Sequence, residues 1–242
     1  MGRGVIKSLA QAAGSEFTEN YFTPFFFCIL HAQLSYMPHI AHLSKDKKMA
    51  KIILQQEKYI LAQRKNVCLH LCYSIMSQQL STRVAGVFHK RFLALFNDKE
   101  PTPKQIIAVP FETLRGIGLS NAKANYVLNV CLFFMEEKIT DVKLYKMSNE
   151  ELIKYLSQIK GIGQWTVEMI LMFTLGREDI FAVDDLGIQQ AICKLYKIDS
   201  TDKKEMKQQM LKVSSKWSPY RTYACRYLWG WKDNVPDAKS KT

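Results

Sequence analysis

The chain has 242 residues, of which 48% are hydrophobic, and a formal net charge of +12. It is long enough to bury a sizeable core, as one domain or as two lobes, and basic enough to bind a polyanion. One strongly apolar stretch, residues 22–30, is interrupted by a proline and too short to cross a bilayer, so no membrane anchor is expected. The charge alone does not separate DNA from RNA, membranes or acidic proteins.

Residues 1–45 give little basis for assigning structure, and we treat them as an N-terminal extension of uncertain order that could be a leader or a tag. The helical core is then expected to span residues 46–242. Strand-like alternation is scarce there, whereas the period of a helix recurs and predicts an all-α fold. The helical segments are residues 52–62, 67–76, 84–96, 122–134 and 207–213.

Another helix is predicted to begin at Thr102 and Pro103, because proline fits a first turn, where its missing N–H is not needed. A Gly-Ile-Gly sequence follows at residues 116–118 and recurs at residues 161–163. We interpret the first copy as mainly structural.

The second Gly-Ile-Gly lies between two predicted helices. Ser148 and Glu151 form a capping-box pattern, from which an apolar helical period runs almost to the glycines. Gly161 and Gly163 permit the positive φ and the close approach that a helix reversal needs. The sequence therefore predicts a helix-hairpin-helix at about residues 148–176.

A phosphate group could bind at the start of the second helix, which opens with Trp165. The first backbone N–H groups of a helix have no internal partner, and the helix dipole is positive at that end. A helix corner without a ligand is an equally good interpretation of the two glycines alone. The candidate phosphate-binding hairpin consists of Lys160, Gly161, Ile162, Gly163 and Thr166.

Two adjacent acids, Asp184 and Asp185, precede the next predicted helix, which covers residues 186–195. One of them has an ordinary role as the N-cap, where its carboxylate accepts from free N–H groups. Two acids exceed that need. The second carboxylate could stabilise a developing positive charge or take a proton from water.

These motifs resemble the helix-hairpin-helix (HhH-GPD) DNA glycosylase superfamily, and in particular its 3-methyladenine DNA glycosylase II branch. The resemblance implies a two-lobed, all-α fold with the DNA and the active site in a cleft between the lobes. It also implies a monofunctional glycosylase of base excision repair, which flips out alkylated purines of the 3-methyladenine and 7-methylguanine type. Such an enzyme hydrolyses the N-glycosidic bond and leaves an abasic site. The matching residues are 78–81, 114–118 with 123–124, 156–166, 179–186, and 217–224 with 229, within a region of about 50–231.

The resemblance also assigns roles to single residues. It makes Asp185 the catalytic acid, with Asp184 as the helix cap beside it. Trp165 and Trp229 would line the base pocket, where an electron-rich ring attracts a positively charged base. Gln79 would be the wedge that intercalates into the gap left by the flipped base. The alternatives are core packing for the tryptophans and an ordinary polar helix end for Gln79.

Members of the superfamily that cut the DNA strand carry a lysine two residues after the second hairpin glycine. This chain has Trp165 there, so no lyase activity is expected. Members with an iron-sulfur cluster carry four closely spaced cysteines, where this chain has only Cys193 and Cys225. The six cysteines form no CxxC pair, and we expect buried thiols, no metal and no cofactor.

The expected partner is double-stranded DNA that contains damaged bases. We expect a monomer located with the DNA inside the cell, in the cytoplasm of a prokaryote or otherwise in the nucleus. Two other functions stay open, a non-catalytic helix-hairpin-helix DNA-binding module and a glycosylase for oxidised or mismatched bases. Asp185 favours an enzyme over a binding module, because a carboxylate repels a phosphate-rich ligand.

Overall fold

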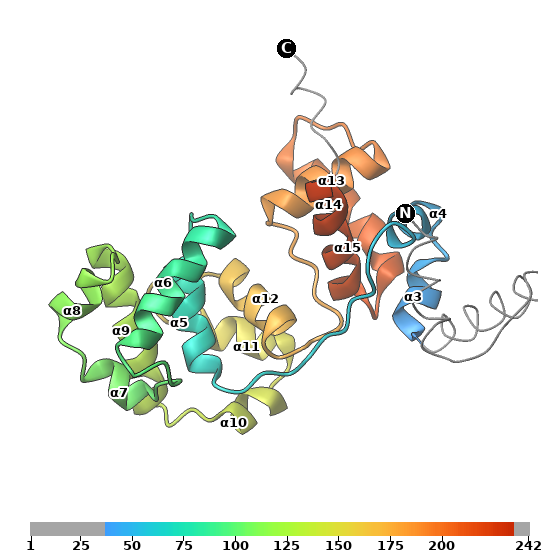
Figure 1. The fold of residues 1–242 in the computed structure, drawn as a ribbon. Coiled ribbons are helices and arrows are strands. Elements are labelled where there is room, and N and C mark those ends of the chain that lie inside the picture. The colour runs from blue at the N-terminus through green and yellow to red at the C-terminus, as the bar shows by residue number, and fades with distance from the viewer. Residues whose placement is uncertain (1–36, 235–242) are drawn as a thin grey trace, which may run out of the picture.

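The structure is a computed structural model that describes residues 37–234. Within these residues every regular element is a helix and no strand occurs, so the all-α prediction is confirmed. Figure 1 shows that the helices form two lobes. The middle of the chain builds one lobe, and segments from both ends of the described part build the other.

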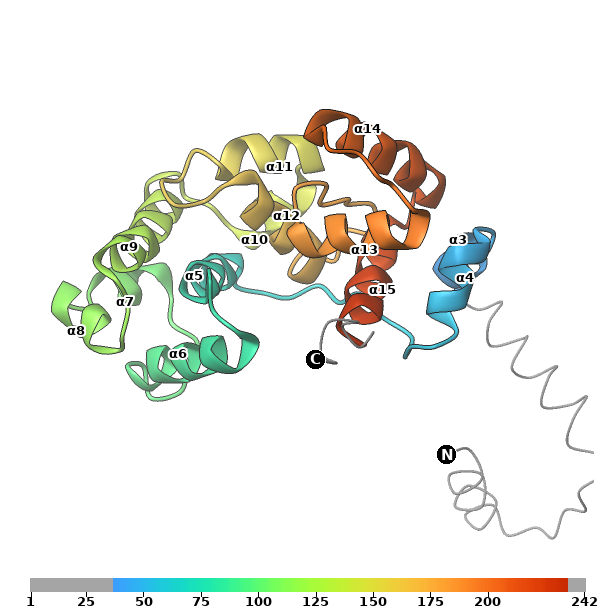
Figure 2. The same cartoon turned by 90° about the horizontal axis from the view of Figure 1, so that it is seen from above.

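The first lobe contains α5 (Val67–Ser77), α6 (Thr82–Ala94), α7 (Pro103–Ile107), α8 (Phe111–Gly116), α9 (Asn121–Glu136), α10 (Asp141–Lys146), α11 (Asn149–Leu156) and α12 (Gln164–Phe173). The second lobe contains α3 (Pro38–Leu43), α4 (Lys47–Ile53), α13 (Leu186–Tyr196), α14 (Lys203–Ser214), the short 3-10 helix η2 (Ser215–Trp217) and α15 (Arg221–Asn234). Figure 2 shows α12 between α5 of the first lobe and α13 of the second.

The core of the first lobe is centred on α5, which packs against α9, α6 and α12. Leu71, Cys72 and Ile75 of α5 are completely buried. Apolar residues occur nearly all round this helix, which is the pattern of a helix covered on all sides. The buried helix fixes the place of its C-terminal end, from which residues 78–81 lead into α6.

The core of the second lobe forms where α15 packs against α13 and α4. Trp217 and Tyr227 are among its fully buried side chains. The guanidinium of Arg221 donates from Nε and Nη2 to the two carboxylate oxygens of Asp179, at 2.6 and 2.9 Å. This bidentate pair holds the segment that leads into α13 against α15.

Two irregular segments connect the lobes, residues 54–66 and 174–185. They meet where the backbone N–H of Arg64 donates to the carbonyl of Thr174 at 2.8 Å. The lobes are therefore joined by two connecting segments that are hydrogen-bonded to each other.

The helix predicted over residues 52–62 is wrong, because α4 ends at Ile53. The side-chain amide of Gln56 donates to the carbonyl of Ile52 at 3.0 Å and to the carbonyl of Tyr227 at 2.9 Å. These bonds close the end of α4 and tie the chain to α15. Contacts with the rest of the protein outweigh the local helical pattern here.

The other predicted helical segments are confirmed as α5, α6, α9 and α14, with small shifts at their ends. Ser148 and Glu151 form the predicted capping box at the start of α11. Thr102 caps α7, and Pro103 stands in its first turn as predicted.

Part of the predicted N-terminal extension is helical and packed. Ile40 and Leu43 of α3 are buried, and α3 contacts α4. The boundary predicted between residues 45 and 46 thus falls between two helices of one lobe, whereas residues 1–36 lie outside the described residues. None of the described helices has the length and apolar character needed to span a membrane.

Candidate active site

Asp185 is the N-cap of α13, and its carboxylate accepts three hydrogen bonds. Oδ1 accepts from the backbone N–H of Ile188 and from the indole N–H of Trp229, both at 2.8 Å. Oδ2 accepts from the indole N–H of Trp165 at 2.9 Å. Trp165 belongs to α12 and Trp229 to α15, so the carboxylate lies where the two lobes meet. The structure thus brings together the three side chains that the sequence analysis assigned to one site.

Asp184 is not the helix cap, and that prediction is wrong. The chain enters α13 through a turn in which the N–H of Asp185 donates to the carbonyl of Ala182. Only the residue directly before the helix can reach the free N–H groups, and that residue is Asp185. Asp184 instead forms an ion pair with Lys207 of α14, with both side chains substantially exposed.

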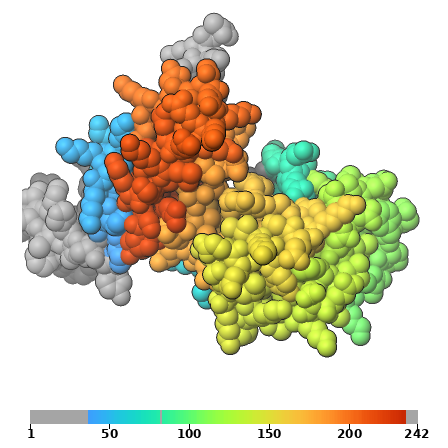
Figure 3. All heavy atoms as spheres, turned by 180° about the vertical axis from the view of Figure 1, so that it is seen from behind, coloured from blue at the N-terminus to red at the C-terminus, as the bar shows by residue number. Residues whose placement is uncertain are grey.

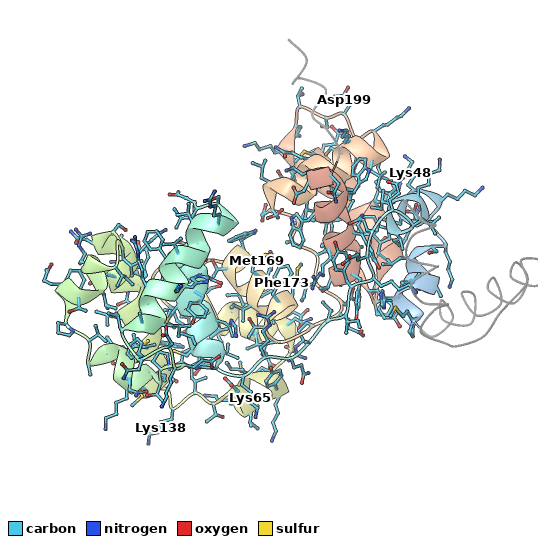
Figure 4. All side chains as sticks on the ribbon, viewed as in Figure 1. Lys48, Lys65, Lys138, Met169, Phe173 and Asp199 are labelled. Atoms are coloured by element: carbon cyan, nitrogen blue, oxygen red, sulfur yellow. The ribbon has the colours of Figure 1, made fainter. Side chains whose placement is uncertain are left out.

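The exposed side of α12 forms an apolar wall. Trp165 and Phe173 are 41% and 38% exposed, and Met169 lies between them, one helical turn from each. Figure 4 shows Met169 and Phe173 on the side of α12 that faces the second lobe. The ring of Trp229 on that lobe lies 5.7 Å from the ring of Phe173. Viewed from behind, the molecular surface is indented where the lobes meet (Figure 3).

The sequence analysis missed Met169 and Phe173 as parts of this wall. Neither residue was considered there as part of a site. Their spacing of four and eight residues from Trp165 places all three on one helix face, which was a usable signal.

Gly187 allows the Trp229 indole to approach Asp185. A Cβ at this position would lie 3.1 Å from Oδ1 of Asp185 and 3.1 Å from Cδ1 and Nε1 of Trp229. Most real Cβ atoms have more space, so with a side chain here the carboxylate or the indole would have to shift by a few tenths of an ångström. The sequence analysis did not single out this glycine, because the need for it arises only when α13 and α15 pack.

The hairpin between α11 and α12 is closed on one side and open on the other. Gly161 has a φ of +103°, and a Cβ there would overlap the ring of Tyr126 on α9. Ile162 is buried and anchors the turn. Gly163 is the N-cap of α12, makes no side-chain cap bond, and has nothing within 4 Å of its missing Cβ. The first N–H groups of α12 therefore lie uncapped beside open space, as a phosphate site requires.

Two further members of the predicted phosphate site differ in their accessibility. The side chain of Lys160 is exposed, and the carbonyl of this residue accepts from Nδ2 of Asn129 at 3.3 Å. Thr166 is 3% exposed, so its side chain is buried, and its place in the phosphate site stays a prediction. Only its backbone N–H, in the first turn of α12, is compatible with the proposed role.

The same region carries the match to a known family. Residues 72–216, more than half of the chain, match the model of the HhH-GPD superfamily of base excision DNA repair proteins. The chain belongs to this superfamily. The matched residues include the hairpin, Trp165 and Asp185 but end before Trp229.

Curated relatives of this HhH-GPD chain carry related names. DNA-3-methyladenine glycosylase 1 of Schizosaccharomyces pombe is 34% identical over 194 residues, which cover 79% of this chain and 84% of the relative. Putative DNA-3-methyladenine glycosylase YfjP of Bacillus subtilis is 34% identical over 168 residues, which cover 67% of this chain and 57% of the relative. The match thus spans little more than half of the second relative.

Solved structures agree with this membership. The Schizosaccharomyces pombe 3-methyladenine DNA glycosylase in complex with abasic DNA has a TM-score of 0.71 and 32% identity, covering 80% of this chain and 95% of that one. A DNA-3-methyladenine glycosidase from Bacillus halodurans has a TM-score of 0.71 and 32% identity, covering 82% and 90%. The two-lobed HhH-GPD fold is therefore confirmed.

The wedge residue predicted for this HhH-GPD chain, Gln79, is exposed in the turn between α5 and α6. Its φ is +61°, a left-handed conformation that is uncommon for residues with a Cβ. Ser81 ends the turn and caps α6, as its hydroxyl accepts from the N–H of Val84 at 3.4 Å.

Glu168 is a buried carboxyl close to the site that the sequence analysis did not identify. It is 4% exposed, and its Oε1 accepts from Nε2 of Gln164 at 2.9 Å. Its Oε2 has no hydrogen-bond partner among the described residues. Burial raises the pKa of Glu168, the bond from Gln164 opposes that rise, and the charges of Asp184 and Asp185 add to it. The protein thus favours the neutral form of this carboxyl.

Three cysteines meet in the core of the first lobe. Sγ of Cys131 on α9 lies 3.9 Å from Sγ of Cys68 and 3.8 Å from Sγ of Cys72 on α5, and all three residues are buried. Structural zinc sites use four ligands, whereas this group offers three, so we describe it as packing of α5 against α9. The expectation of no metal stays a prediction.

Proposed function

We propose that this protein is a monofunctional DNA glycosylase that hydrolyses the N-glycosidic bond of alkylated purines in double-stranded DNA. One observation carries the proposal. The carboxylate of Asp185 is held by two indole N–H groups and one backbone N–H at the junction of the lobes. Membership of a base excision repair superfamily and the names of the curated relatives support the reaction and the substrate class.

The proposed chemistry follows from the charge that develops on the sugar. As the N-glycosidic bond breaks, the deoxyribose becomes cationic, and a nearby carboxylate stabilises that cation far more than the neutral ground state. Three donors already orient Asp185, so little reorganisation is needed when the charge appears. We infer that Asp185 stabilises the cationic sugar and orients the attacking water.

The proposed base pocket uses the faces of Trp165 and Trp229. Both indoles direct their N–H edge toward Asp185, which leaves the ring faces for the flipped base. An alkylated purine carries positive charge, and a cation over an aromatic face gains ~0.5–2 kcal/mol. The same charge weakens the bond to the sugar, so recognition and reactivity favour the same substrates.

We infer that the hairpin binds the DNA backbone beside the reacting nucleotide. The uncapped N–H groups after Gly163 and the positive end of the α12 dipole attract a phosphate. Lys160, exposed at the same turn, adds a positive side chain. This arrangement supports damaged double-stranded DNA as the partner, and we expect one monomer to act on it in the compartment that holds the DNA.

We infer further that the protein does not cut the strand. Lyase chemistry needs an amine that forms a Schiff base with the sugar. Trp165 stands in the position that the amine would need, and the ammonium of Lys207 is paired with Asp184. We therefore expect the site to hydrolyse the N-glycosidic bond without cutting the strand.

The test is base release from duplexes that contain alkylated, deaminated or oxidised bases, measured side by side. We expect free 3-methyladenine or 7-methylguanine from alkylated DNA, with strand breaks only after alkali. Release confined to the oxidised duplex would overturn the substrate class. Breaks without alkali would overturn the monofunctional assignment, and binding without any release would leave a DNA-binding module.

A further inference from the structure

The turn between α5 and α6, residues 78–81, has a conformation that needs support. Gln79 at its tip has a φ of +61° and an exposed side chain. A residue with a Cβ adopts this conformation stably only where its surroundings hold it there. The contacts that stabilise this turn therefore show which residues keep Gln79 in this conformation.

Lys123, in the first helical turn of α9, binds the α5–α6 turn through its side chain. Its Nζ donates to the carbonyl of Met76 at 3.0 Å and to the carbonyl of Gln78 at 2.7 Å. The carbonyls in the last turn of a helix have no internal partner, and the negative end of the helix dipole attracts a cation. Lys123 satisfies both needs at the end of α5.

The turn's own backbone N–H groups are used elsewhere. That of Gln78 donates to the carbonyl of Ile75 at 3.3 Å, and that of Leu80 donates to the carbonyl of Ser77 at 3.1 Å. They cannot replace Lys123 at the two carbonyls that it binds. Partial burial lowers the pKa of Lys123, because removal from water disfavours the ammonium. The two carbonyls thus bind the ammonium although its partial removal from water is unfavourable.

A second, separate contact ties the end of α5 to α6. Oγ of Ser77 lies 2.9 Å from Nε2 of His89, whose ring stacks on Tyr73 at 4.3 Å. This contact fixes the helix before the turn, and Lys123 fixes the turn itself. Gln79, at the tip of the turn, is exposed.

We propose that Lys123 is a positioning residue, which keeps Gln79 ready in the projecting conformation that fills the DNA gap when a base is flipped out. The inference rests on the proposed function and on the wedge role that the sequence analysis assigned to Gln79. A turn that is ordered before binding loses less conformational freedom on insertion, so more of the contact energy favours the flipped state. Lys123 touches neither base nor sugar in this role.

The experiment compares single-turnover base release from two alkylated substrates. In one, the damaged base is paired in a duplex, and in the other it faces a one-nucleotide gap, so that no base pair has to be broken when it flips out. We expect K123M to slow release from the paired substrate by about tenfold or more, as small misplacements near a site commonly do. We expect less than about a threefold effect on the gapped substrate, and recovery by K123R, which keeps the donors.

A double mutant tests whether Lys123 acts through Gln79. If it does, K123M/Q79A is no slower than Q79A alone, because residues that act as one unit are not additive. Additive losses would overturn the proposal, and so would equal losses on both substrates with a lowered melting temperature. A decrease of about one in the salt-dependence slope of binding would assign Lys123 to a phosphate instead.

The wild type and Q79A distinguish failure of the proposed function, of the wedge role of Gln79 and of the positioning role of Lys123. If the wild type releases no base, the proposed function fails. If the wild type is active but Q79A keeps full activity on the paired substrate, Gln79 is not the wedge. If both behave as expected and K123M equals the wild type, the role of Lys123 is refuted.

Discussion

The protein contains two Gly-Ile-Gly hairpins, one between α8 and α9 and one between α11 and α12, with a similar local construction. Each has one glycine in the positive-φ region, Gly118 at +106° and Gly161 at +103°. Each of these glycines lies against an aromatic ring, that of Phe88 in the first hairpin and that of Tyr126 in the second. In both, a short helix is turned back into a longer one.

The two hairpins differ in how the following helix is capped. The hydroxyl of Ser120 accepts from the N–H of Lys123 at 3.2 Å, so α9 is capped by its own chain. Gly163 precedes α12 and offers no side-chain cap, and its surroundings are open. In each hairpin the cap lies two residues after the positive-φ glycine, at Ser120 in the first and at Gly163 in the second, so the cap residue decides between a closed corner and a place for a phosphate. This difference supports the interpretation of the first copy as structural.

The largest effect is expected from G161A. The substitution combines backbone strain at positive φ, about 2 kcal/mol, with overlap of the Tyr126 ring, about 2 kcal/mol more. Urea denaturation should show a loss of about 4 kcal/mol in the free energy of unfolding. G116A is the matched control, because a Cβ there has nothing within 4 Å. Equal destabilisation by both changes would contradict the account of the hairpins.

The next largest effect separates the hairpins by function. G163D places a carboxylate where we expect the phosphate, and such like-charge contacts cost several kcal/mol, so affinity for duplex DNA should drop by about a hundredfold. The fold should change little in stability, because aspartate is a good N-cap. S120D puts the same carboxylate on the first hairpin and should leave affinity nearly unchanged. Equal weakening by both variants, measured by fluorescence anisotropy, would remove the phosphate site from the second hairpin.

A smaller effect concerns the cap of the first hairpin. S120A should lower the free energy of unfolding by about 1 kcal/mol, the usual value of a lost N-cap, with unchanged affinity for undamaged duplex. Denaturation and binding curves measured on one preparation suffice. A loss of affinity without a loss of stability would show that the first hairpin also contacts DNA.

The smallest effect sharpens the contrast between α12 and α9, since only α12 carries a buried carboxyl. The pKa of Glu168 is raised above its usual 4.5 in the folded protein, so folding is favoured while the group is protonated. This contribution is complete below pH 4.5 and is lost as pH rises through the raised pKa. The melting temperature of E168Q should therefore rise relative to that of the wild type as pH rises. A constant difference, or a melting temperature of E168Q that falls relative to that of the wild type as pH rises, would contradict the assignment.

The sequence predicted what local chemistry decides. The capping box of Ser148 and Glu151 and the reversal at Gly161 depend on residues a few positions apart, and both formed as expected. The grouping of Trp165 and Trp229 with Asp185 came from resemblance to a family, because their meeting depends on how the two lobes pack.

The predictions that failed, and the contacts that were not predicted, involve residues far apart in the sequence. Asp184 and Asp185 satisfy the same local rule for an N-cap, and the entry into α13 together with Lys207 decides between them. The Cys72–Cys131 contact joins residues 59 positions apart, and the bond from Lys123 to Gln78 joins residues 45 apart. Neither separation leaves a periodic signal in the sequence.

The most direct test of the central claim is single-turnover base release by D185N and D184N on alkylated duplex DNA. Asparagine keeps the shape of the side chain and one oxygen for the N-cap, so D185N removes the negative charge and replaces the oxygen that accepts from the Trp165 indole N–H with an amide donor. We predict that D185N slows base release by about 10²–10³-fold or more while it still binds the DNA. D184N should stay within about fivefold of the wild type, because it breaks only an exposed ion pair. An active D185N beside an inactive D184N would contradict the account.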